Sequence, residues 1–147
     1  MLDLRGQLPT GPGAYLQRDL VGVRFIALHH SGSEYDSSAK EIAEYHIRTY
    51  GWPGCGYQLV SRWDGTLEWV WDWTTMSYNV ARRNHEVIGI CCPGDYRQRE
   101  PRPAQLRAAL DAAWWLSHEV APGAQIVGHR EIALPGFETE CPGRLLE

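Results

Sequence analysis

Two histidines and one cysteine stand at positions where their side chains could bind one metal ion together. His29 lies at the end of the apolar segment Val21–His30, next to its last residue, and His129 directly follows a second apolar segment, Gln125–Gly128. The ends of strands commonly carry functional groups in open α/β sheets. Cys141 precedes a Pro-Gly turn farther along the chain. Two imidazoles and one thiolate leave a fourth zinc position open, which is the pattern of catalytic zinc sites. Such a zinc ion lowers the pKa of bound water toward ~7 and polarises a carbonyl group.

The adjacent histidines His29 and His30 cannot both face one site from a strand. Successive side chains of a strand point to opposite faces of the sheet, so at most one of the two reaches the metal. The strand pattern alone does not show which of the two binds the metal. We expect the histidine that does not bind it to lie in the core or to be hydrogen-bonded behind the site. The competing interpretation is that these histidines and Cys141 are unrelated core and surface residues.

The segments that must hold these residues alternate between strands and helices. Apolar or alternating stretches predict five strands: Val21–His30, Gly56–Ser61, Thr66–Trp71, Val87–Cys91 and Gln125–Gly128. Asp64-Gly65 predicts the turn of a hairpin between the second and third of these strands. Helices are predicted over residues 38–50 and 103–120. We therefore expect an α/β fold with a central mixed sheet flanked by helices and the zinc site at the strand ends.

Both predicted helices have recognisable ends and a stripe of residues expected to be buried. Ser38 and Glu41 have the spacing of a capping box, and Gly51 suits the end of the first helix. The stripe of this helix is Ile42, Tyr45, His46 and Thr49, and we expect His46 to be a packed core histidine. The second helix has Pro103 in its first turn. Its stripe is Leu106, Leu110, Ala113, Trp114 and Ser117.

Length and composition predict one domain, residues 1–147, and we expect a monomer. The chain has 147 residues, 44% of them hydrophobic, which suffices for a core without disulfides. The net charge is −4 and no basic run occurs, which argues against binding to nucleic acid. No segment reaches the ~18 consecutive apolar residues of a membrane span. The opening segment MLDLRGQLPT has no basic leader or apolar stretch, so we expect no secretory signal and reduced cysteines.

Five groups of residues occur in order along residues 21–146. They are Ile26–Gly32 (IALHHSG); His46 with Gly51-Trp52 and Gly56-Tyr57; Asn84 with Ile88-Gly89-Ile90; Pro103 with Gln105-Leu106; and Gly128-His129-Arg130 with Thr139–Gly143. Together they resemble the N-acetylmuramoyl-L-alanine amidase family, which includes phage lysozyme-type amidases and peptidoglycan recognition proteins. Each group is weak alone, whereas their order and spacing together are specific.

The resemblance assigns roles to individual residues. It implies that the zinc ligands are His29, His129 and Cys141, with His30 beside the site and not a ligand. It further implies that Tyr57 lies over the metal and helps to stabilise the oxyanion. Thr139 falls where related enzymes carry a lysine or threonine that faces the substrate. Hydrogen-bond donors aimed at a developing oxyanion are worth ~2.7–4 kcal/mol each.

Contacts with substrate are expected from His30, Asn79 and Asn84. Asn79 departs from the family pattern, because many members have histidine at this position, and whether the asparagine keeps that residue's contact, with substrate or behind a metal ligand, stays open. Gln58 also departs, because relatives often carry histidine after the Gly-Tyr pair, and we expect this change to alter substrate contacts. The sequence does not identify the group that moves the proton, for which the candidates are Glu86, Glu131 and Glu140.

The resemblance implies zinc-dependent hydrolysis of the amide bond between N-acetylmuramic acid and L-alanine in bacterial peptidoglycan. The role expected is that of a phage or prophage endolysin, made in the cytoplasm and acting on the cell wall after release. A cytosolic amidase that recycles muropeptides is an alternative. A second alternative is a non-catalytic peptidoglycan-binding recognition module, although such relatives have usually lost the cysteine that this chain retains as Cys141. A cysteine hydrolase using Cys141 and His129 is a third alternative, although Cys141 precedes a proline turn rather than opening a helix, so little would lower the pKa of its thiol.

Overall fold

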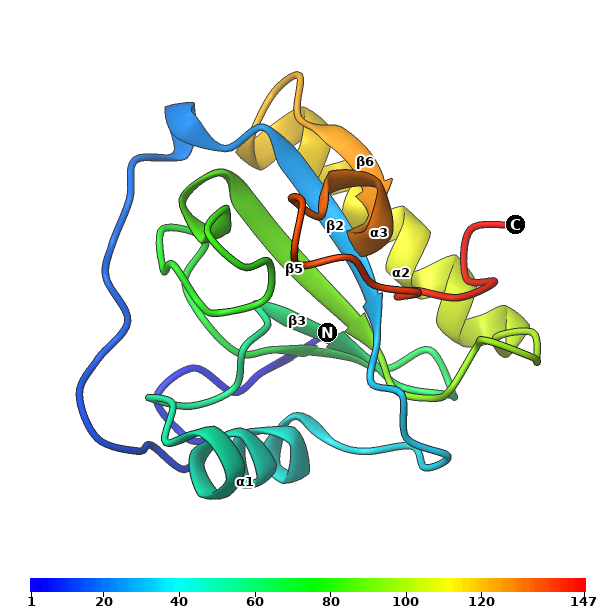
Figure 1. The fold of residues 1–147 in the computed structure, drawn as a ribbon, viewed down its shortest axis with the longest axis horizontal. Helices are drawn as coiled ribbons and strands as arrows, with labels where there is room; N and C mark the ends of the chain where they lie inside the picture. Colours follow the sequence, from blue (N-terminus) through cyan, green and yellow to red (C-terminus); the bar gives the residue numbers. More distant parts are fainter.

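The computed structural model describes all residues, 1–147, and is built around a mixed six-stranded sheet in the order β1-β4-β3-β5-β2-β6 (Figure 1). The strands are β1 (Leu2–Asp3), β2 (Phe25–His30), β3 (Leu59–Ser61), β4 (Leu67–Trp69), β5 (Val87–Cys92) and β6 (Gln125–Gly128). Only β3 and β4 pair in antiparallel fashion, and the other neighbouring strands run parallel. The predicted α/β class with a mixed sheet is confirmed.

Helices cover both faces of this sheet. The α-helices are α1 (Ala39–Tyr50), α2 (Pro103–Trp115) and α3 (His129–Ile132). Short 3-10 turns form η1 (Leu20–Gly22) and η2 (Asn84–Glu86), and a π-helical turn, η3 (Leu116–Val120), continues α2. Figure 1 shows α2 behind the sheet, with α1 and α3 on the near side. None of these helices combines the length and the apolar character needed to cross a membrane.

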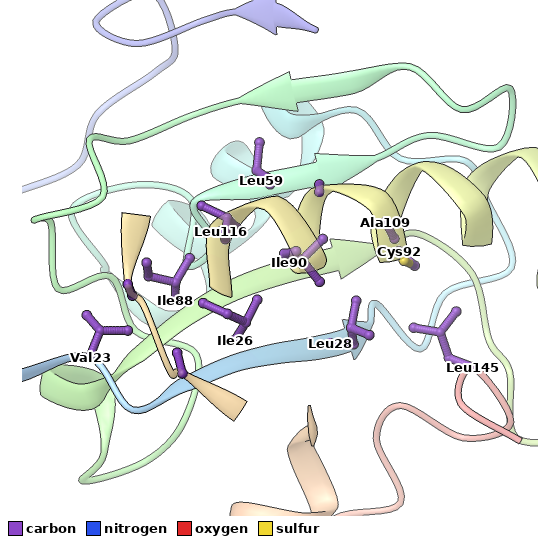
Figure 2. Packing of buried hydrophobic residues seen from close by; sticks show 14 of the residues in the cluster. Val23, Ile26, Leu28, Leu59, Ile88, Ile90, Cys92, Ala109, Leu116 and Leu145 are labelled. Carbon is purple, nitrogen blue, oxygen red and sulfur yellow. The ribbon is translucent and has the colours of Figure 1, made fainter. Parts of the chain in front are cut away.

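Alternation along β2 divides the interior into two faces. Ile26 and Leu28 point toward α2 and belong to the largest buried cluster, in which they pack with Ile88, Ile90 and Leu116 (Figure 2). The side chains between them along β2 point to the opposite face. That face carries His29, so the helix α2 and the large apolar core lie behind the candidate site and support it.

The helix α1 forms as the sequence predicts. The hydroxyl of Ser38 accepts a hydrogen bond from the backbone N–H of Glu41, the Glu41 carboxylate accepts from the Ser38 N–H, and Gly51 ends the helix in a left-handed conformation. Of the predicted stripe, Ile42 and His46 are buried, whereas Tyr45 and Thr49 are exposed. The buried side of α1 instead includes Ala39 and Ala43, whose small side chains let the helix lie close to the sheet.

A buried carboxylate on β4 fixes the start of α1. One oxygen of Glu68 accepts a hydrogen bond from the backbone N–H of Ala39 at 2.7 Å, and the other pairs with Arg62 at 3.1 Å. A negative charge at a helix N-terminus is favourable, because the first N–H groups of a helix have no partners within it. Glu68 therefore ties α1 to the sheet and sets the position of its buried face.

The predicted buried face of α2 is partly wrong. Ala113 and Ser117 are buried as expected, but Leu110 is 37% exposed and Trp114 is 58% exposed. Gln105 occupies the interior instead, where its amide donates to the carbonyl groups of Ser61 and Pro93. These bonds rotate the helix so that a polar residue and several alanines, rather than the larger apolar residues, face the sheet.

Three predicted strands are shorter in the structure. The strand predicted over Val21–His30 begins only at Phe25, because η1 turns the chain before it. The strands predicted over Gly56–Ser61 and Thr66–Trp71 are limited to β3 and β4. The predicted turn at Asp64-Gly65 is present, and Gly65 adopts a positive φ of 87° that favours glycine.

Candidate metal centre

Strand register brings the two predicted histidine ligands together. β6 pairs parallel with β2, and Leu28 lies opposite Gly128. The next residue along the chain is a histidine in both cases, so His29 near the end of β2 and His129 at the start of α3 lie side by side at the same edge of the sheet. The centroids of their rings are 4.7 Å apart.

Cys141 reaches this pair from the C-terminal segment. Its Sγ lies 3.8 Å from Nδ1 of His29 and accepts a hydrogen bond from the backbone N–H of His30 at 3.4 Å. Gly128 permits this approach, because a Cβ there would lie 2.8 Å from Cδ of Pro142. The potential ligand atoms of His29, His129 and Cys141 all lie within 4.8 Å of one another. The three predicted ligands therefore converge on one point.

The donor set fits a zinc ion. Tetrahedral zinc with Zn–N and Zn–S bonds of ~2.0–2.3 Å holds its ligand atoms roughly 3.3–3.8 Å apart, so small side-chain movements close the site. Burial lowers the pKa of His29 well below its ordinary value and also lowers that of His129. Both imidazoles are therefore neutral near pH 7, the form that binds metals.

The thiol of Cys141 would lose its proton on binding zinc. Burial raises the pKa of this thiol to about 12. A thiol with this pKa is protonated near neutral pH and is a poor nucleophile by itself. The environment of Cys141 therefore disfavours the cysteine-hydrolase alternative, whereas a bound cation would favour the thiolate.

Tyr57 lies beside the three converging side chains. Its ring centroid is 5.1 Å from that of His29. Burial raises the pKa of the Tyr57 phenol well above its ordinary value, so the hydroxyl keeps its proton and can donate a hydrogen bond. Tyr57 also lines a hollow of about 330 Å³ together with Ser31, Ser33 and His46. A ligand in this hollow would lie against both the phenol and the first helix.

Thr139 contacts the backbone of Cys141. Its hydroxyl oxygen accepts a hydrogen bond from the backbone N–H of Cys141 at 3.1 Å, which leaves the hydroxyl proton free for donation. Thr139 lines a polar hollow of about 460 Å³ that also includes Arg97, Arg130 and Glu140. The two predicted donors, Tyr57 and Thr139, thus belong to different hollows near the same cluster.

The side chain of His30 points away from the cluster. Its Nδ1 accepts a hydrogen bond from the backbone N–H of Tyr96 at 3.1 Å and lies 3.9 Å from a carboxylate oxygen of Asp95. His30 touches the site only through its backbone contact with Cys141. This placement agrees with the implied position beside the site, and a substrate contact from the His30 ring stays a prediction.

The side chains of Asn84 and Gln58 form hydrogen bonds that hold the backbone. The side-chain oxygen of Asn84 accepts from the backbone N–H groups of Asn79 and Val80, both at 2.9 Å. Gln58 is completely buried, donating to the Thr75 carbonyl and accepting from the Gly89 N–H, both at 2.7 Å. The expectation that Gln58 alters substrate contacts is wrong, because its amide is enclosed and links β5 to the loop at Thr75.

The three candidate proton acceptors occupy different surroundings. A carboxylate oxygen of Glu131 accepts from the Gly128 N–H at 3.1 Å, and Glu86 pairs with Arg83. Glu140 is exposed and lines the polar hollow next to Thr139. Glu140 alone of the three makes no structural bond of the kind described for Glu131 and Glu86, and it lies next to Thr139, a proposed catalytic residue.

His46 holds the backbone that carries Tyr57. It is buried, as predicted, and its Nδ1 accepts a hydrogen bond from the Gly56 N–H at 3.0 Å. The apolar stripe of the helix indicated that this residue is buried, but it gave no indication of the bond to Gly56. Burial lowers the pKa of His46 to about 4.

This pKa predicts loss of stability in acid. An unfolded chain takes up a proton on His46 near pH 6.5, whereas the folded protein does so only near pH 4. The free energy of unfolding should therefore decrease as the pH falls from 6.5 to 4, by on the order of 3 kcal/mol from this residue. Above pH 6.5 the titration of this residue should cause no further change in stability. Urea unfolding of metal-free protein at pH 7, 6, 5 and 4 measures this decrease.

A matched pair of variants isolates the contribution of His46. His46→Asn keeps an acceptor near the Gly56 N–H but does not titrate, so its stability should fall less over the same range. The exposed His85→Asn should behave as the wild type does. Equal pH dependence in His46→Asn and wild type would show that His46 is not the source.

Comparison with known proteins gives one family. A family model described as N-acetylmuramoyl-L-alanine amidase matches residues 18–144. Peptidoglycan-recognition protein SC2 of Drosophila simulans is 31% identical over an alignment of 132 positions, which covers 81% of this chain and 67% of that protein. These matches confirm the resemblance inferred from the five groups of residues.

Solved structures agree on the fold. The Ph2119 endolysin from Thermus scotoductus MAT2119 bacteriophage Ph2119 has a TM-score of 0.84 and 26% sequence identity, over 97% of this chain and 90% of that one. The N-acetylmuramoyl-L-alanine amidase LysC from Clostridium intestinale URNW has a TM-score of 0.79 and 20% identity, over 97% and 89% of the two chains.

Proposed function

The chain belongs to the N-acetylmuramoyl-L-alanine amidase family, and we propose that it is a zinc-dependent enzyme that hydrolyses the bond between N-acetylmuramic acid and L-alanine in bacterial peptidoglycan. One observation carries the proposal. His29, His129 and Cys141 place three potential ligand atoms within 4.8 Å of one another at the ends of strands, next to the protonated phenol of Tyr57. Three ligands with an open fourth position suit catalysis.

The residues around the metal have distinct tasks in this mechanism. When bound, zinc would polarise the amide carbonyl and make water nucleophilic near neutral pH. His29, His129 and Cys141 would hold the ion, and the backbone N–H of His30 donates to the ligand sulfur. Tyr57 would donate a hydrogen bond to the carbonyl oxygen as negative charge develops on it, and the Thr139 hydroxyl would face the substrate.

The biological role that we propose is that of a phage or prophage endolysin, which acts on the cell wall after release from the cytoplasm. The similarity to the Ph2119 endolysin supports this role. The similarity to peptidoglycan-recognition proteins supports peptidoglycan as the ligand and keeps recognition without cleavage as the second candidate. The complete set of two histidines and one cysteine supports the enzyme over the recognition module.

The products of digestion test the substrate bond. Purified sacculi treated with the zinc-loaded protein should release new L-alanine amino termini without new reducing sugar ends, because the amide and not the glycosidic bond is cut. Derivatisation of free amines and a reducing-sugar assay on the same digest measure both products. Reducing ends without free alanine amines would make the protein a glycosidase.

A second substrate separates the two enzymatic roles. Products from soluble anhydromuropeptides alone, with intact sacculi left uncut, would favour the recycling amidase over the endolysin. Binding to sacculi without either product, in protein that contains zinc, would favour the recognition module.

A further inference from the structure

One ring nitrogen of His29 is buried without a hydrogen-bond partner. Nδ1 of this ring lies 3.8 Å from Sγ of Cys141 and therefore faces the metal cluster. Nε2, on the opposite edge of the ring, is buried and has no partner. A buried polar group without a partner costs ~1–3 kcal/mol, so an unpaired Nε2 next to a predicted ligand atom needs an explanation.

The side chain of Asn79 offers the matching acceptor. Its Nδ2 donates to the carbonyl and hydroxyl oxygens of Ser77, at 3.2 and 3.4 Å, which fixes which end of the amide is the oxygen. The oxygen, Oδ1, is buried and also has no partner. In the whole protein only one other buried side-chain nitrogen or oxygen, Nε of Arg18, is unpaired.

The two unpaired atoms belong to the same face of the sheet, because the Asn79 side chain lies over Gly89 and Gly89 is on the face that carries His29. Neither atom has a hydrogen bond of normal geometry, however. Hydrogen bonds of this kind are often long in free enzymes and shorten when the site is filled.

Gly89 provides the space for the Asn79 side chain. A Cβ at Gly89 would lie 2.8 Å from Cγ and 2.9 Å from Oδ1 of Asn79. Gly89 lies opposite Ala27 on β2, two residues before His29 and therefore on the same face of the sheet. The Gly89 N–H is in turn held by Gln58. A glycine that is fixed in this way leaves a gap that the Asn79 amide fills.

We propose that Asn79 is a positioning residue, whose carbonyl oxygen accepts a hydrogen bond from Nε2–H of His29 and so keeps Nδ1 unprotonated and aimed at the zinc. This inference rests on the proposed function, since it takes His29 to be a zinc ligand. Of the two contacts that the sequence left open for Asn79, with substrate or behind a metal ligand, it selects the second and names the atoms that make it. Metal-binding histidines almost always donate their other ring N–H to a carboxylate or carbonyl, which fixes the tautomer.

The tautomer of His29 can be measured in metal-free protein. Long-range ¹H–¹⁵N spectra at pH 7.5 should show His29 of the wild type as the Nε2–H tautomer alone. Asn79→Leu keeps the volume but removes the acceptor, and should give a mixture of tautomers or the Nδ1–H form. Asn79→Asp keeps an acceptor oxygen and should retain the wild-type tautomer.

Zinc affinity supplies the second measurement. Competition with a chelator of known affinity should show zinc binding to Asn79→Leu weakened 10–100-fold. Asn79→Asp should bind zinc at least as tightly as the wild type. Gly89→Ala should weaken binding as Asn79→Leu does, because the new methyl group displaces the Asn79 side chain. Circular dichroism and thermal melting identify folded samples, and Asn79→Ala replaces Asn79→Leu if the latter does not fold.

Two results would overturn the inference. One is an unchanged tautomer and a zinc affinity within twofold of wild type in folded Asn79→Leu. The other is unchanged zinc affinity with a raised KM, which would make Asn79 a substrate contact. If the wild type binds no zinc, the proposed function fails, whereas the tautomer experiment still decides whether the hydrogen bond exists.

Discussion

Replacing any one of the three predicted ligands should empty the metal site. His29→Ala, His129→Ala and Cys141→Ala should each reduce the zinc content from about one equivalent to near zero and abolish lysis. The reason is geometric, because the three potential ligand atoms converge within 4.8 Å and two protein ligands do not complete a catalytic zinc site. Elemental analysis of purified protein, together with turbidity loss of a sacculus suspension, measures both effects.

His30→Ala is the matched control for this experiment. His30 is adjacent to His29, but its ring bonds to the Tyr96 N–H and its contact with Cys141 comes from the backbone. The variant should therefore keep its zinc. Full zinc content in His29→Ala, or zinc loss in His30→Ala alone, would show that the wrong member of the pair has been assigned to the metal.

Tyr57→Phe should slow the reaction without emptying the site. The variant removes only the hydroxyl, which is expected to bond to the carbonyl oxygen more strongly as negative charge develops there. A donor of this kind is worth ~2.7–4 kcal/mol, so kcat should fall roughly 10²–10³-fold with little change in KM. Steady-state kinetics on a soluble muramyl peptide, with zinc content measured on the same sample, gives both values.

Thermal melting separates this role from a structural one. Tyr35→Phe, which removes a hydroxyl from a side chain that is 76% exposed, should leave kinetics and stability unchanged. A large loss of melting temperature in Tyr57→Phe would instead make Tyr57 a core residue with an internally satisfied hydroxyl. Unchanged kcat in a folded, zinc-loaded sample would remove Tyr57 from the mechanism and make Thr139 the next donor to test.

Much of the metal centre could be predicted from the sequence because it depends on local features. His29 and His129 each follow an apolar strand, and parallel pairing of the two strands is enough to place them side by side. The capping box at Ser38 and the glycine at position 51 likewise act within one helix. The choice of His29 over His30 came only from the resemblance to the family. Alternation of side chains along the strand shows that His29 and His30 cannot both bind the metal, but it does not show which of them does.

The features that escaped prediction depend on contacts between distant segments. The rotation of α2 follows from bonds that Gln105 makes to Ser61 and Pro93, which no helical periodicity encodes. The enclosed position of Gln58 follows in the same way from its bonds to Thr75 and Gly89. Each of these amides bonds to backbone far away in sequence, so its surroundings are known only once the chain is folded.

The dependence of amide cleavage on zinc occupancy tests whether this protein is a zinc-dependent amidase. Metal-free protein is titrated with zinc, and the rate at which L-alanine amino termini appear from purified sacculi is measured at each point. We expect negligible cleavage without metal, a rate that rises in proportion to bound zinc, and a plateau at one zinc per chain. Full activity in protein shown to be free of metal, or one bound zinc per chain with no cleavage of the amide, would contradict this expectation.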